Sequence, residues 1–524
     1  MGEFTAEEEA ILKRYVSNTT GNVFVLMNLP EVIKGALFSR YSRSTKSLRR
    51  LLLDEFINNP ELGIQLVKEN TGADDSLAVQ KAEAFYDRIL DGFGDDSVGE
   101  LGGVHVALEN ISNIATKTIQ DLRIGGSPLE KSSRYVWFNK KVDGDYLFLK
   151  EATIMAGEHR EKYLALNRKL FETYESLIEP MKAHFTAKVP RDAGIPEQAY
   201  NFSIRARACD SLRGLLPAST LTNMGVFGNG RFFEYLLLKL RTSPLAELHA
   251  IADELQLELD KIIPSFVRRG HPEHSHFKLS ELHMNQMRAV LEQHRVYDAT
   301  TKQRTVDLVD YDPAAEEKVL ASLLYPYSNQ QLRTLRRRVR EMTSEQRQAL
   351  ITELLAKRSN RRHKPPRAFE NAYYTFDILA DFGCYRDLQR HRMLTQDRQL
   401  LTVEHGYDLP AEITDAGFAD KWEECMEAAA NLYTELADNP YEAQYVVPFA
   451  YKVRWYFTIN ARGIYWLTEL RSGQQGHPNY RRIAQEMYTL VKSVHPSLFS
   501  KAFVDMNDYS LGRLAAEVQK TLHG

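Results

Sequence analysis

Cysteine is scarce in this chain of 524 residues, which contains only Cys209, Cys384 and Cys425. Because no two of them are close in sequence, neither a disulfide framework nor a cysteine-based zinc site is expected. Long apolar runs are missing as well: none approaches the roughly 20 residues of a membrane span, and the acidic start MGEFTAEEEA is unlike a signal peptide. These absences predict a cytoplasmic protein with no membrane partner.

An excess of positive charge is also missing, because 67 Lys and Arg residues face 70 Asp and Glu residues. Nucleic acid is therefore not expected as a partner, although the stretches RYSRSTKSLRR and RTLRRRVR leave local binding open. Hydrophobic residues at 43% and charged residues at 26% are typical of a globular protein. At about 150 residues per domain, the length predicts two to four domains.

Ordered landmarks recur in the two halves of the chain. Both VFVLMNLPEVIKGALFSRYSRSTKSLRRLL and VDLVDYDPAAEEKVLASLLYPYSNQQLRTLRRRV read as a strand, a turn and a helix, followed by an aromatic-Ser step and a basic stretch. Later, a Leu-Leu-Pro or Val-Val-Pro step precedes an Asn-x-Arg motif, with 12 residues from Pro to Asn in each half. These motifs contain Asn229 and Arg231, then Asn460 and Arg462. The repetition predicts a duplicated domain of roughly 250 residues.

The join between the copies is predicted in RRGHPEHSHFKLSELH, a polar stretch rich in Gly, Pro and His. We expect an N-terminal domain over 1–268, a linker over 269–290 and a C-terminal domain over 291–524. The histidines of this stretch invite a metal interpretation, but no acidic or cysteine partner stands at ligand spacing. A solvated linker is the favoured interpretation, and no metal site is predicted.

Helical periodicity dominates each half. The segments EHREKYLALNRKLFETYESLIEPMKAHF and ADKWEECMEAAANLYTELADN place apolar residues at helical spacing, and the apolar stretches after Glu100 and Glu370 are also interpreted as helices. Strands are expected at FVLMN and RYVWF in the first half and at TVDLVDY and LLTVEH in the second. The pattern predicts an α+β fold: two tandem, helix-rich copies with a small sheet in each.

Arg390-His391-Arg392 is the most unusual local motif, at the predicted end of an apolar helix and one turn after Asp387. Two guanidiniums suit a phosphate group, and an imidazole can stack on a ring system or hydrogen-bond to it. A solvated helix end explains the same residues without a ligand, because basic side chains favour the helix dipole there. The surrounding landmarks decide between these interpretations.

The ordered series Glu370, Arg390, Pro448, Asn460-Ala-Arg462 and Arg471 resembles that of the flavin-dependent thymidylate synthases, and the likeness covers most of both halves. It implies that the arginine-histidine-arginine run holds FAD and that Arg471 activates the uracil ring by favouring ionised N3. In the second half the positions implied to bind the cofactor are Glu370, Arg390, His391, Arg392, Asn460 and Arg462. In the first half they are Ser42, Ser97, Glu100, Asn229 and Arg231.

The second half departs from that family at its nucleotide positions. Where the family carries Glu-x-Ser-x-Arg, this half has Arg398, Leu400 and Thr402, and Gln444 replaces an arginine. The first half departs in the opposite sense, since it keeps those residues but has Leu122-Arg123-Ile124 in place of the arginine-histidine-arginine run. The resemblance therefore implies that the first half mainly binds the nucleotide and the second mainly binds FAD.

The nucleotide-binding positions implied by the resemblance are Glu130, Ser132, Arg134, Arg213 and Arg241, together with Asp387 and Arg471 from the second half. Arg241 and Arg471 are the implied catalytic residues. Without a ligand, the first-half group would be helix caps and surface ion pairs, each worth about 1 kcal/mol or less. A carboxylate, a hydroxyl and several guanidiniums together suit a phosphate and the edge of a pyrimidine.

The reaction implied by the resemblance is methylation of dUMP at C5 to give dTMP. Methylenetetrahydrofolate provides the carbon, FAD the hydride and NADPH the electrons that restore the flavin. A homodimer of the tandem chain would form a pseudo-tetramer with sites shared between halves. Three alternatives stay open: another pyrimidine nucleotide or one-carbon transfer, binding without turnover, and nucleic-acid binding through the basic stretches.

Overall fold

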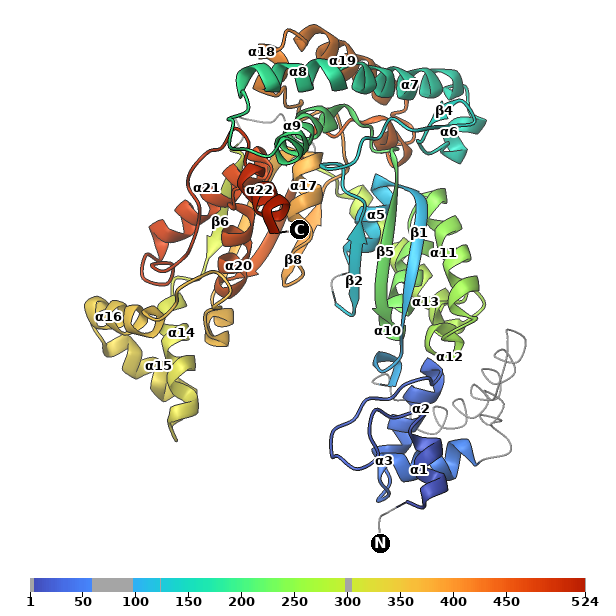
Figure 1. The fold of residues 1–524 in the computed structure, drawn as a ribbon, viewed down its shortest axis with the longest axis vertical. Helices are drawn as coiled ribbons and strands as arrows, with labels where there is room; N and C mark the ends of the chain where they lie inside the picture. Colours follow the sequence, from blue (N-terminus) through green and yellow to red (C-terminus); the bar gives the residue numbers. More distant parts are fainter. Residues whose placement is uncertain (1–3, 59–97, 123, 297–303, 524) are drawn as a thin grey trace. The chain divides into compact units, whose positions relative to one another are not determined.

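The computed structural model describes residues 4–58, 98–122, 124–296 and 304–523 (Figure 1). Ser97 and Arg123, singled out by the sequence, lie outside the described residues. The chain divides into two compact units, and each is described by itself. The first unit contains Met1–Glu109, Thr118–Glu130 and Asn223–Tyr297. The second contains Asn110–Lys117, Lys131–Thr222 and Asp298–Gly524.

The two units do not follow the domain boundaries predicted from the sequence, because the segment 131–222 belongs to the same unit as the second half. The reason is visible at the repeated proline steps, where Pro217 and Pro448 form an antiparallel bridge. The backbone N–H of Phe449 donates to the carbonyl of Leu216 at 2.9 Å, and that of Ala218 donates to the carbonyl of Val447 at 2.9 Å. The two matching landmarks of the sequence thus pair with each other.

The first unit combines helices with a three-stranded sheet of order β1-β5-β2. Its strands are β1 (Gly103–Ser112), β2 (Gly126–Glu130) and β5 (Leu221–Asn229). Its early helices are α1 (Ala6–Leu12), α2 (Glu31–Tyr41), α3 (Leu48–Leu51), η1 (Leu52–Ile57) and η3 (Val98–Glu100). Its later helices are α10 (Gly230–Arg241), α11 (Ala246–Leu259), α12 (Pro264–Val267), η5 (Arg268–Gly270) and α13 (Ser275–Gln293).

The predicted linker 269–290 is largely helical, because α13 occupies most of it. Phe277 is the buried residue of α13, so the helix is mostly solvated as the polar sequence indicates. His271, one of its histidines, lies 3.2 Å from a carboxylate oxygen of Asp260. In the described part of the chain, no group of three or more His, Cys, Asp or Glu side chains could hold a metal ion.

The second unit contains a four-stranded sheet of order β6-β7-β9-β8, whose neighbouring strands are antiparallel. These strands are β6 (Val306–Tyr311), β7 (Tyr373–Asp381), β8 (Leu394–Arg398) and β9 (Lys452–Asn460). A hairpin is formed by β3 (Lys141–Val142) and β4 (Asp145–Tyr146). The helices contributed by the first half are α6 (Ala152–Ala156), α7 (Arg160–Ser176), α8 (Ile178–Lys188), α9 (Glu197–Leu212) and η4 (Arg213–Leu215), with α5 (Asn113–Gln120) beginning in this unit.

The second half contributes the remaining helices of this unit. Those before β9 are α14 (Ala315–Leu324), η6 (Tyr325–Tyr327), α15 (Leu332–Glu341), α16 (Ser344–Leu355), η7 (Arg367–Asn371), α17 (Phe382–Leu388), α18 (Ala411–Asp415), α19 (Ala419–Glu435) and η8 (Glu442–Val446). Those after it are α20 (Ala461–Arg471), α21 (Pro478–Val494) and α22 (Leu514–His523). The fold is therefore α+β, helix-rich with small sheets.

The helices predicted over 158–185 and 419–439 are present as α7 with α8 and as α19, whereas several other expectations were wrong. The apolar stretches after Glu100 and Glu370 each begin with a strand, β1 and β7, before a short helix. In β7 the buried residues Tyr374, Phe376 and Ile378 recur at every second position, which is the strand period rather than the helical one. FVLMN, RYVWF and LLTVEH form no strands, while TVDLVDY contains β6.

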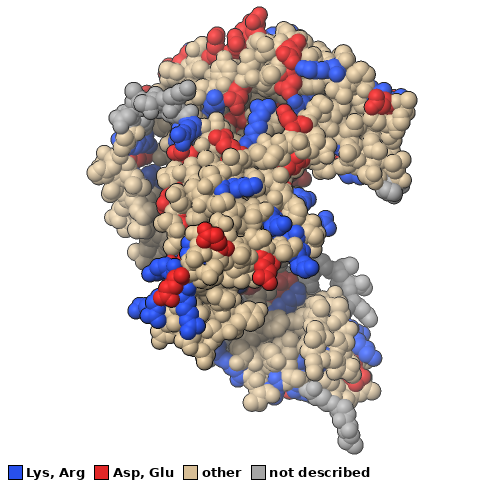
Figure 2. All heavy atoms as spheres, turned by 90° about the vertical axis from the view of Figure 1, so that its left-hand side faces the viewer, with Lys and Arg blue, Asp and Glu red and all other residues tan. Residues whose placement is uncertain are grey.

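Charges of both signs mix on the surface. The face drawn in Figure 2 carries Lys and Arg side chains interspersed with Asp and Glu. Within the basic α15, Arg336 and Arg340 both form ion pairs with Glu317, at 2.6 and 2.9 Å. Part of the RTLRRRVR stretch is thus engaged inside its own unit. No helix in the described residues is long and apolar enough to cross a bilayer.

Candidate functional site

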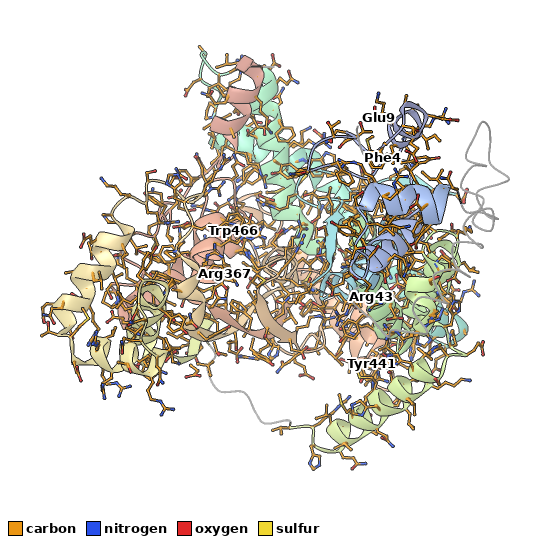
Figure 3. The ribbon with its side chains drawn as sticks, turned by 90° about the horizontal axis from the view of Figure 1, so that it is seen from below. Phe4, Glu9, Arg43, Arg367, Tyr441 and Trp466 are labelled. Atoms are coloured by element: carbon orange, nitrogen blue, oxygen red, sulfur yellow. The ribbon has the colours of Figure 1, made fainter. Side chains whose placement is uncertain are left out.

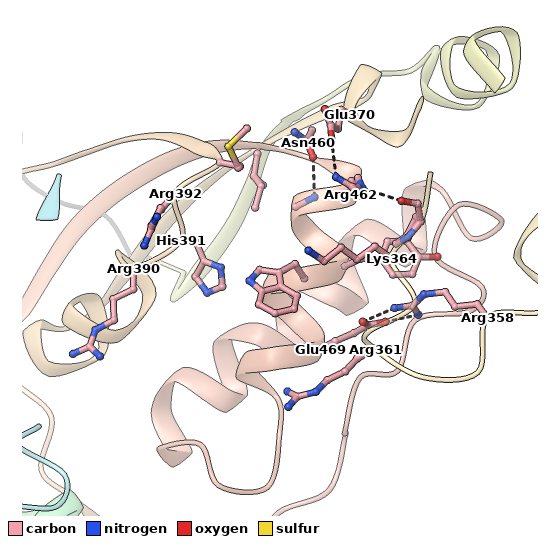
Figure 4. A pocket seen from close by; sticks show the side chains of 16 residues that line it. Arg358, Arg361, Lys364, Glu370, Arg390, His391, Arg392, Asn460, Arg462 and Glu469 are labelled. Atoms are coloured by element: carbon pink, nitrogen blue, oxygen red, sulfur yellow. Dashed lines mark hydrogen bonds and ion pairs between the residues drawn. The ribbon is translucent and has the colours of Figure 1, made fainter. Parts of the chain in front are cut away.

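A pocket of about 490 Å³ in the second unit gathers the residues that the sequence assigns to the cofactor (Figure 4). All six second-half positions line it: Glu370, Arg390, His391, Arg392, Asn460 and Arg462. Figure 4 shows the arginine-histidine-arginine run on one side and three further cations, Arg358, Arg361 and Lys364, on the other. Six cationic side chains thus face the carboxylates of Glu370 and Glu469, so we call this the basic pocket.

The first turn of α20 forms one wall of the basic pocket. The side chain of Asn460 caps this helix, its oxygen accepting from the N–H of Gly463 at 2.8 Å. Arg462, in the same turn, donates from Nη1 to Glu370 at 2.9 Å and from Nε to the carbonyl of Pro365 at 2.8 Å. The Asn-x-Arg motif therefore shapes the pocket in two ways: its Asn starts the helix and its Arg fixes the facing η7 segment.

An exposed aromatic ring completes the wall. Trp466 lies on α20 with 44% of its surface exposed, and Arg367 lies on η7, an element in contact with α20 (Figure 3). Lys364 stands 5.3 Å from the centre of the Trp466 ring. A diphosphate-bearing ligand with flat rings fits this lining, since guanidiniums suit phosphate oxygens and an indole offers a stacking face. The residues present are therefore suited to FAD.

The sequence predicts the arginine-histidine-arginine run at the end of a helix. In the structure the run follows the helix instead. α17 stops at Leu388, and the run lies in the turn before β8. His391 is buried, while Arg390 and Arg392 are exposed. Burial, and then the neighbouring charge of Arg471, hold the pKa of His391 well below its ordinary value. The imidazole is therefore neutral, and its Nε2 accepts from Nε of Arg471 at 3.0 Å.

A second group of charged and polar residues is largely buried in the same unit, and we call it the nucleotide cluster after the role that the resemblance predicts for its arginines. It contains the predicted positions Arg134, Arg213, Asp387 and Arg471, together with Asp210, Asp381 and Tyr480. Arg213, on η4 of the first half, donates from Nη1 to Oδ2 of Asp387 on α17 at 2.9 Å. Arg213 is only 3% exposed, and within the described chain its Nη2 has no hydrogen-bond partner.

Asp387 lies within a field of positive charge. Burial acts to raise its pKa, but nearby guanidiniums outweigh burial and hold the pKa of Asp387 well below its usual range. Those guanidiniums belong to Arg213, Arg390, Arg134 and Arg471. Asp210 and Asp381 offset part of the positive charge of these four guanidiniums, since Asp210 pairs with Arg134 and Asp381 acts on Arg213.

Arg134 is almost saturated by the protein. Its Nε and Nη2 donate to the two oxygens of Asp210 at 2.9 and 3.2 Å, and Nη2 also donates to the carbonyl of Gln475 at 3.1 Å. Its Nη1 donates to the hydroxyl of Tyr480 at 2.7 Å. Four of the five guanidinium N–H groups are therefore used, and one remains for a ligand. The hydroxyl of Ser132 supports this turn, accepting from the N–H of Arg134 at 3.2 Å.

Tyr480 connects the nucleotide cluster with the basic pocket. The guanidiniums of Arg134 and Arg471 lie 5.2 and 5.5 Å from the centre of its ring. Since Arg471 also contacts His391, a continuous path runs from Arg134 in the first half to the pocket lining in the second. Sequence reasoning missed Tyr480, Asp210 and Asp381, because no local motif marks them and only the fold brings them to the arginines.

Two of the second-half positions that depart from the family, Arg398 and Gln444, hydrogen-bond to each other. The side-chain oxygen of Gln444 accepts from Nη1 of Arg398 and from the N–H of Leu401, both at 3.1 Å. Its amide nitrogen donates to the carbonyl of Tyr441 at 3.0 Å. Gln444 and Arg398 therefore hydrogen-bond within the protein. The corresponding places in the first half are those of Arg213 and of the turn before Arg134.

A counterpart of the basic pocket lies in the first unit, with a volume of about 740 Å³. Glu100, Asn229 and Arg231 line it, and Arg231 pairs with Glu100 at 2.7 Å just as Arg462 pairs with Glu370. Asn229 caps α10 as Asn460 caps α20. Arg269, the other arginine among the described lining residues, is paired with Glu234 at 2.9 Å. These two arginines are thus balanced by two carboxylates, whereas the basic pocket has six cations and two carboxylates.

The remaining first-half candidates lie away from the lining of either pocket. Ser42 ends α2 and donates to the carbonyl of Ser39 at 2.8 Å. Glu130 is buried and accepts from the amide of Gln120 at 3.0 Å. Arg241 is buried at the end of α10 and pairs with Asp253 of α11 at 3.0 Å. Its catalytic role stays a prediction.

The α+β fold thus carries a basic pocket and, beside it, a cluster rich in buried arginines. The model of the family described as thymidylate synthase complementing protein matches residues 49–265 and 307–497, so the chain belongs to that family. A UPF0159 protein of Chlamydia pneumoniae is 47% identical over 99% of this chain and 98% of its own length.

Two further proteins are more distant. A protein named flavin-dependent thymidylate synthase from Geobacter sulfurreducens is 31% identical over 25% of this chain and 62% of its own length. A solved Helicobacter pylori structure, described as the flavin-dependent thymidylate synthase ThyX complexed with FAD and dUMP, is 18% identical with a TM-score of 0.29. That alignment covers 38% of this chain and 99% of the other.

Proposed function

We propose that this chain is a flavin-dependent methyltransferase that converts dUMP to dTMP, with methylenetetrahydrofolate as carbon donor and NADPH as reductant. Membership of the family supports thymidylate synthase-type chemistry. The observation that carries the proposal is the position of Arg471. This residue contacts His391 in the basic pocket and the ring of Tyr480 in the nucleotide cluster, so it would lie between FAD and a nucleotide bound at these two places.

FAD would be held in the basic pocket and would supply the hydride for the reduction. Arg390 and Arg392 would offer guanidiniums to its diphosphate and Trp466 a ring face, while Arg462, paired with Glu370, would hold the pocket wall. The first turn of α20, capped by Asn460, adds backbone N–H groups and the positive end of the helix dipole.

The nucleotide would lie at the nucleotide cluster. Arg213 has a buried Nη2 for which the described chain provides no acceptor, and Arg134 keeps one N–H of five. A buried donor without a partner costs roughly 1–3 kcal/mol, so a phosphate oxygen that accepts from it gains that amount on binding. These donors support a monophosphate as the ligand.

Arg471 would stabilise negative charge on the pyrimidine ring. Its Nε is fixed by the hydrogen bond to neutral His391, which leaves the outer nitrogens of the guanidinium free to orient toward a ligand. A preorganised cation at a developing anion lowers the barrier without a proton transfer or a side-chain nucleophile. The buried thiols agree with this scheme, since burial raises the pKa of Cys209 to about 12.

A second candidate is a flavoprotein that acts on another pyrimidine nucleotide. It is supported by the near saturation of Arg134, which leaves less of this guanidinium for a phosphate than the resemblance implies. A flavin- and nucleotide-binding homologue without turnover is the third.

Turnover separates these candidates. The purified chain is supplied with FAD, NADPH, methylenetetrahydrofolate and dUMP, and dTMP is measured by chromatography. We expect dTMP, and we expect Arg471→Gln to lower the rate about a hundredfold or more. Lys492→Gln, a charge loss at an exposed site on α21, is the matched control and should leave the rate unchanged.

Other outcomes identify the alternatives. A flavin spectrum that responds to dUMP without dTMP formation would indicate a non-catalytic homologue. A response to deoxycytidine monophosphate and none to dUMP would favour the second candidate. Loss of turnover in Arg241→Gln, with Arg471→Gln active, would move the catalytic arginine to the first half.

We also propose a homodimer of about 120 kDa, twice the 60.2 kDa of the chain, that behaves as a pseudo-tetramer. Light scattering of the FAD-loaded protein tests this mass. A monomer at micromolar concentration would contradict sites shared between chains.

A further inference from the structure

Residues 498–523, near the end of the 524-residue chain, lie beyond the region that the family model matches, which ends at residue 497. We call them the C-terminal segment. It follows α21 and ends in α22, which packs against α9. Because α9 carries Asp210 near its end, the C-terminal segment reaches the nucleotide cluster.

The first part of the C-terminal segment is fastened to the helices of the second half. The N–H of Phe503 donates to a carboxylate oxygen of Glu469 on α20 at 2.8 Å, and that of Asp505 donates to the hydroxyl of Ser472 at 3.0 Å. Gln485 of α21 donates to the carbonyl of Asp505 at 2.8 Å. The segment therefore has a defined path along α20 and α21 before it crosses to α9.

Its second part places Arg513 against Asp210. Nη2 of Arg513 lies 3.1 and 2.8 Å from the two carboxylate oxygens, and the guanidinium stands 4.8 Å from the centre of the Tyr135 ring. Arg513 is 6% exposed. The same carboxylate receives two hydrogen bonds from Arg134, so two buried guanidiniums share one carboxylate.

The C-terminal segment also touches the loop that contacts Arg134. A Cβ on Gly512 would lie 2.1 Å from the carbonyl oxygen of Gln474, so only glycine allows this approach. The next residue, Gln475, accepts from Arg134 through its carbonyl. The segment thus contacts two of the groups that orient Arg134, namely Asp210 and the loop around Gln475.

The charge balance gives these contacts a consequence. Arg134 with Asp210 alone is a neutral buried pair, whereas Arg134 and Arg513 with Asp210 carry a net charge of +1. Burial weakens screening by water and salt, so this difference acts strongly on an anion nearby. Burial acts to raise the pKa of Asp210, but Arg134 and then Arg513 hold it well below its ordinary value, so the carboxylate stays charged.

We propose that the C-terminal segment completes the nucleotide site: Arg513 neutralises Asp210, so that Arg134 keeps its positive charge for the phosphate of a nucleotide. Arg513 is a positioning residue, since it acts through Asp210 and Arg134. The proposal rests on the proposed function only for the identity of the nucleotide, because the contact between Arg513 and Asp210 favours any phosphate at Arg134.

The test uses the full chain loaded with FAD and titrates dUMP, deoxyuridine and inorganic phosphate by calorimetry. Arg513→Gln should weaken binding of dUMP and phosphate about tenfold or more, the effect of one charge-assisted contact. It should leave the affinities for deoxyuridine and FAD unchanged. Arg513→Lys, which keeps the charge, should retain most of the dUMP affinity.

A charge-compensating variant makes the test independent of a simple folding defect. Asp210→Asn combined with Arg513→Gln restores the net charge of +1, so it should recover affinity for dUMP and phosphate that Arg513→Gln alone loses. Lys520→Gln is the matched control, because Lys520 lies on α22, the helix that follows Arg513, and pairs with Glu517 at 2.7 Å.

Each result has a distinct meaning. Equal dUMP affinity in the wild type and Arg513→Gln overturns the inference and leaves the proposed function standing. An equal loss for dUMP and deoxyuridine, without recovery in the double variant, also overturns it, since it would indicate a structural role. Phosphate binding that depends on Arg513, without dUMP binding, supports the inference and contradicts the proposed function. A wild type that binds neither dUMP nor phosphate overturns both.

Discussion

Nη1 of Arg213 lies 2.9 Å from Oδ2 of Asp387, although 174 residues separate them in the chain. The first belongs to the half for which the sequence predicts the nucleotide residues, and the second precedes the arginine-histidine-arginine run of the other half. Their ion pair brings residues of both halves into one unit. Ligand sites composed of residues from both halves, as the resemblance implies, would require such contacts.

Flavin binding should depend on the basic pocket and not on its counterpart. We expect Arg390→Ala and His391→Ala to release FAD, because both side chains line the basic pocket. Arg231→Ala is the matched control, since Arg231 occupies the equivalent of Arg462 in a charge-balanced pocket. Absorbance of the desalted protein measures bound FAD. If Arg231→Ala loses the flavin while Arg390→Ala keeps it, the two halves have been assigned backwards.

The stoichiometry should be one FAD per chain. The basic pocket is lined by six cations and by two carboxylates that pair with Arg358 and Arg462, whereas both arginines among the described residues of the counterpart, Arg231 and Arg269, are paired. A diphosphate gains little from guanidiniums already neutralised by carboxylates. Titration of FAD followed by absorbance and protein quantitation gives the ratio. Two flavins bound per chain with similar affinity would contradict this specialisation.

Arg213→Ala should weaken dUMP binding by about 1.5–3 kcal/mol, roughly ten- to a hundredfold, as expected for a lost charge-assisted contact. It should also lower the unfolding temperature, because Asp387 loses its hydrogen-bonded partner in a buried site. The double variant with Asp387→Asn removes the unpaired carboxylate and should recover stability without recovering dUMP affinity. Recovery of both would show that Arg213 has only a structural role.

The contribution of Asp381 to the free energy of unfolding should fall as the pH rises from about 4 to 6. Burial raises the pKa of this carboxyl to about 6, against the pull of Arg213 and with a further push from Asp408. A raised folded-state pKa means that the folded state binds the proton more tightly than the unfolded state, whose Asp titrates near 3.9. The stabilisation that the protonated carboxyl of Asp381 provides is therefore lost once the pH exceeds about 6.

Asp381→Asn removes this titration but keeps an oxygen that can accept from the N–H of Cys384, as Asp381 does at 2.8 Å. The difference in unfolding free energy between variant and wild type should therefore shift in favour of the variant by about 1 kcal/mol between pH 5 and pH 7. Denaturant unfolding at both pH values measures it. A difference that does not change with pH would contradict a titrating Asp381.

Local motifs predicted the lining of the basic pocket well, because its residues occur in short runs with characteristic spacing. Arg390, His391 and Arg392 are consecutive, and Asn460 and Arg462 start a single helix. The prediction of a helix after Glu370 was wrong, because an apolar stretch is compatible with both the helical and the strand period. In the structure the buried residues Tyr374, Phe376 and Ile378 alternate with more exposed ones along strand β7.

The sequence by itself predicted the α+β, helix-rich fold and the family, whose model matches the two regions 49–265 and 307–497, because residue types and their spacing can be read along the chain. Only the tertiary structure decided that Pro217 pairs with Pro448, that Arg213 meets Asp387 and that Arg513 shares Asp210 with Arg134. Such pairs are set by the packing of helices and strands far apart in the chain. A buried charge must find its partner wherever the fold provides one, and no local pattern records that choice.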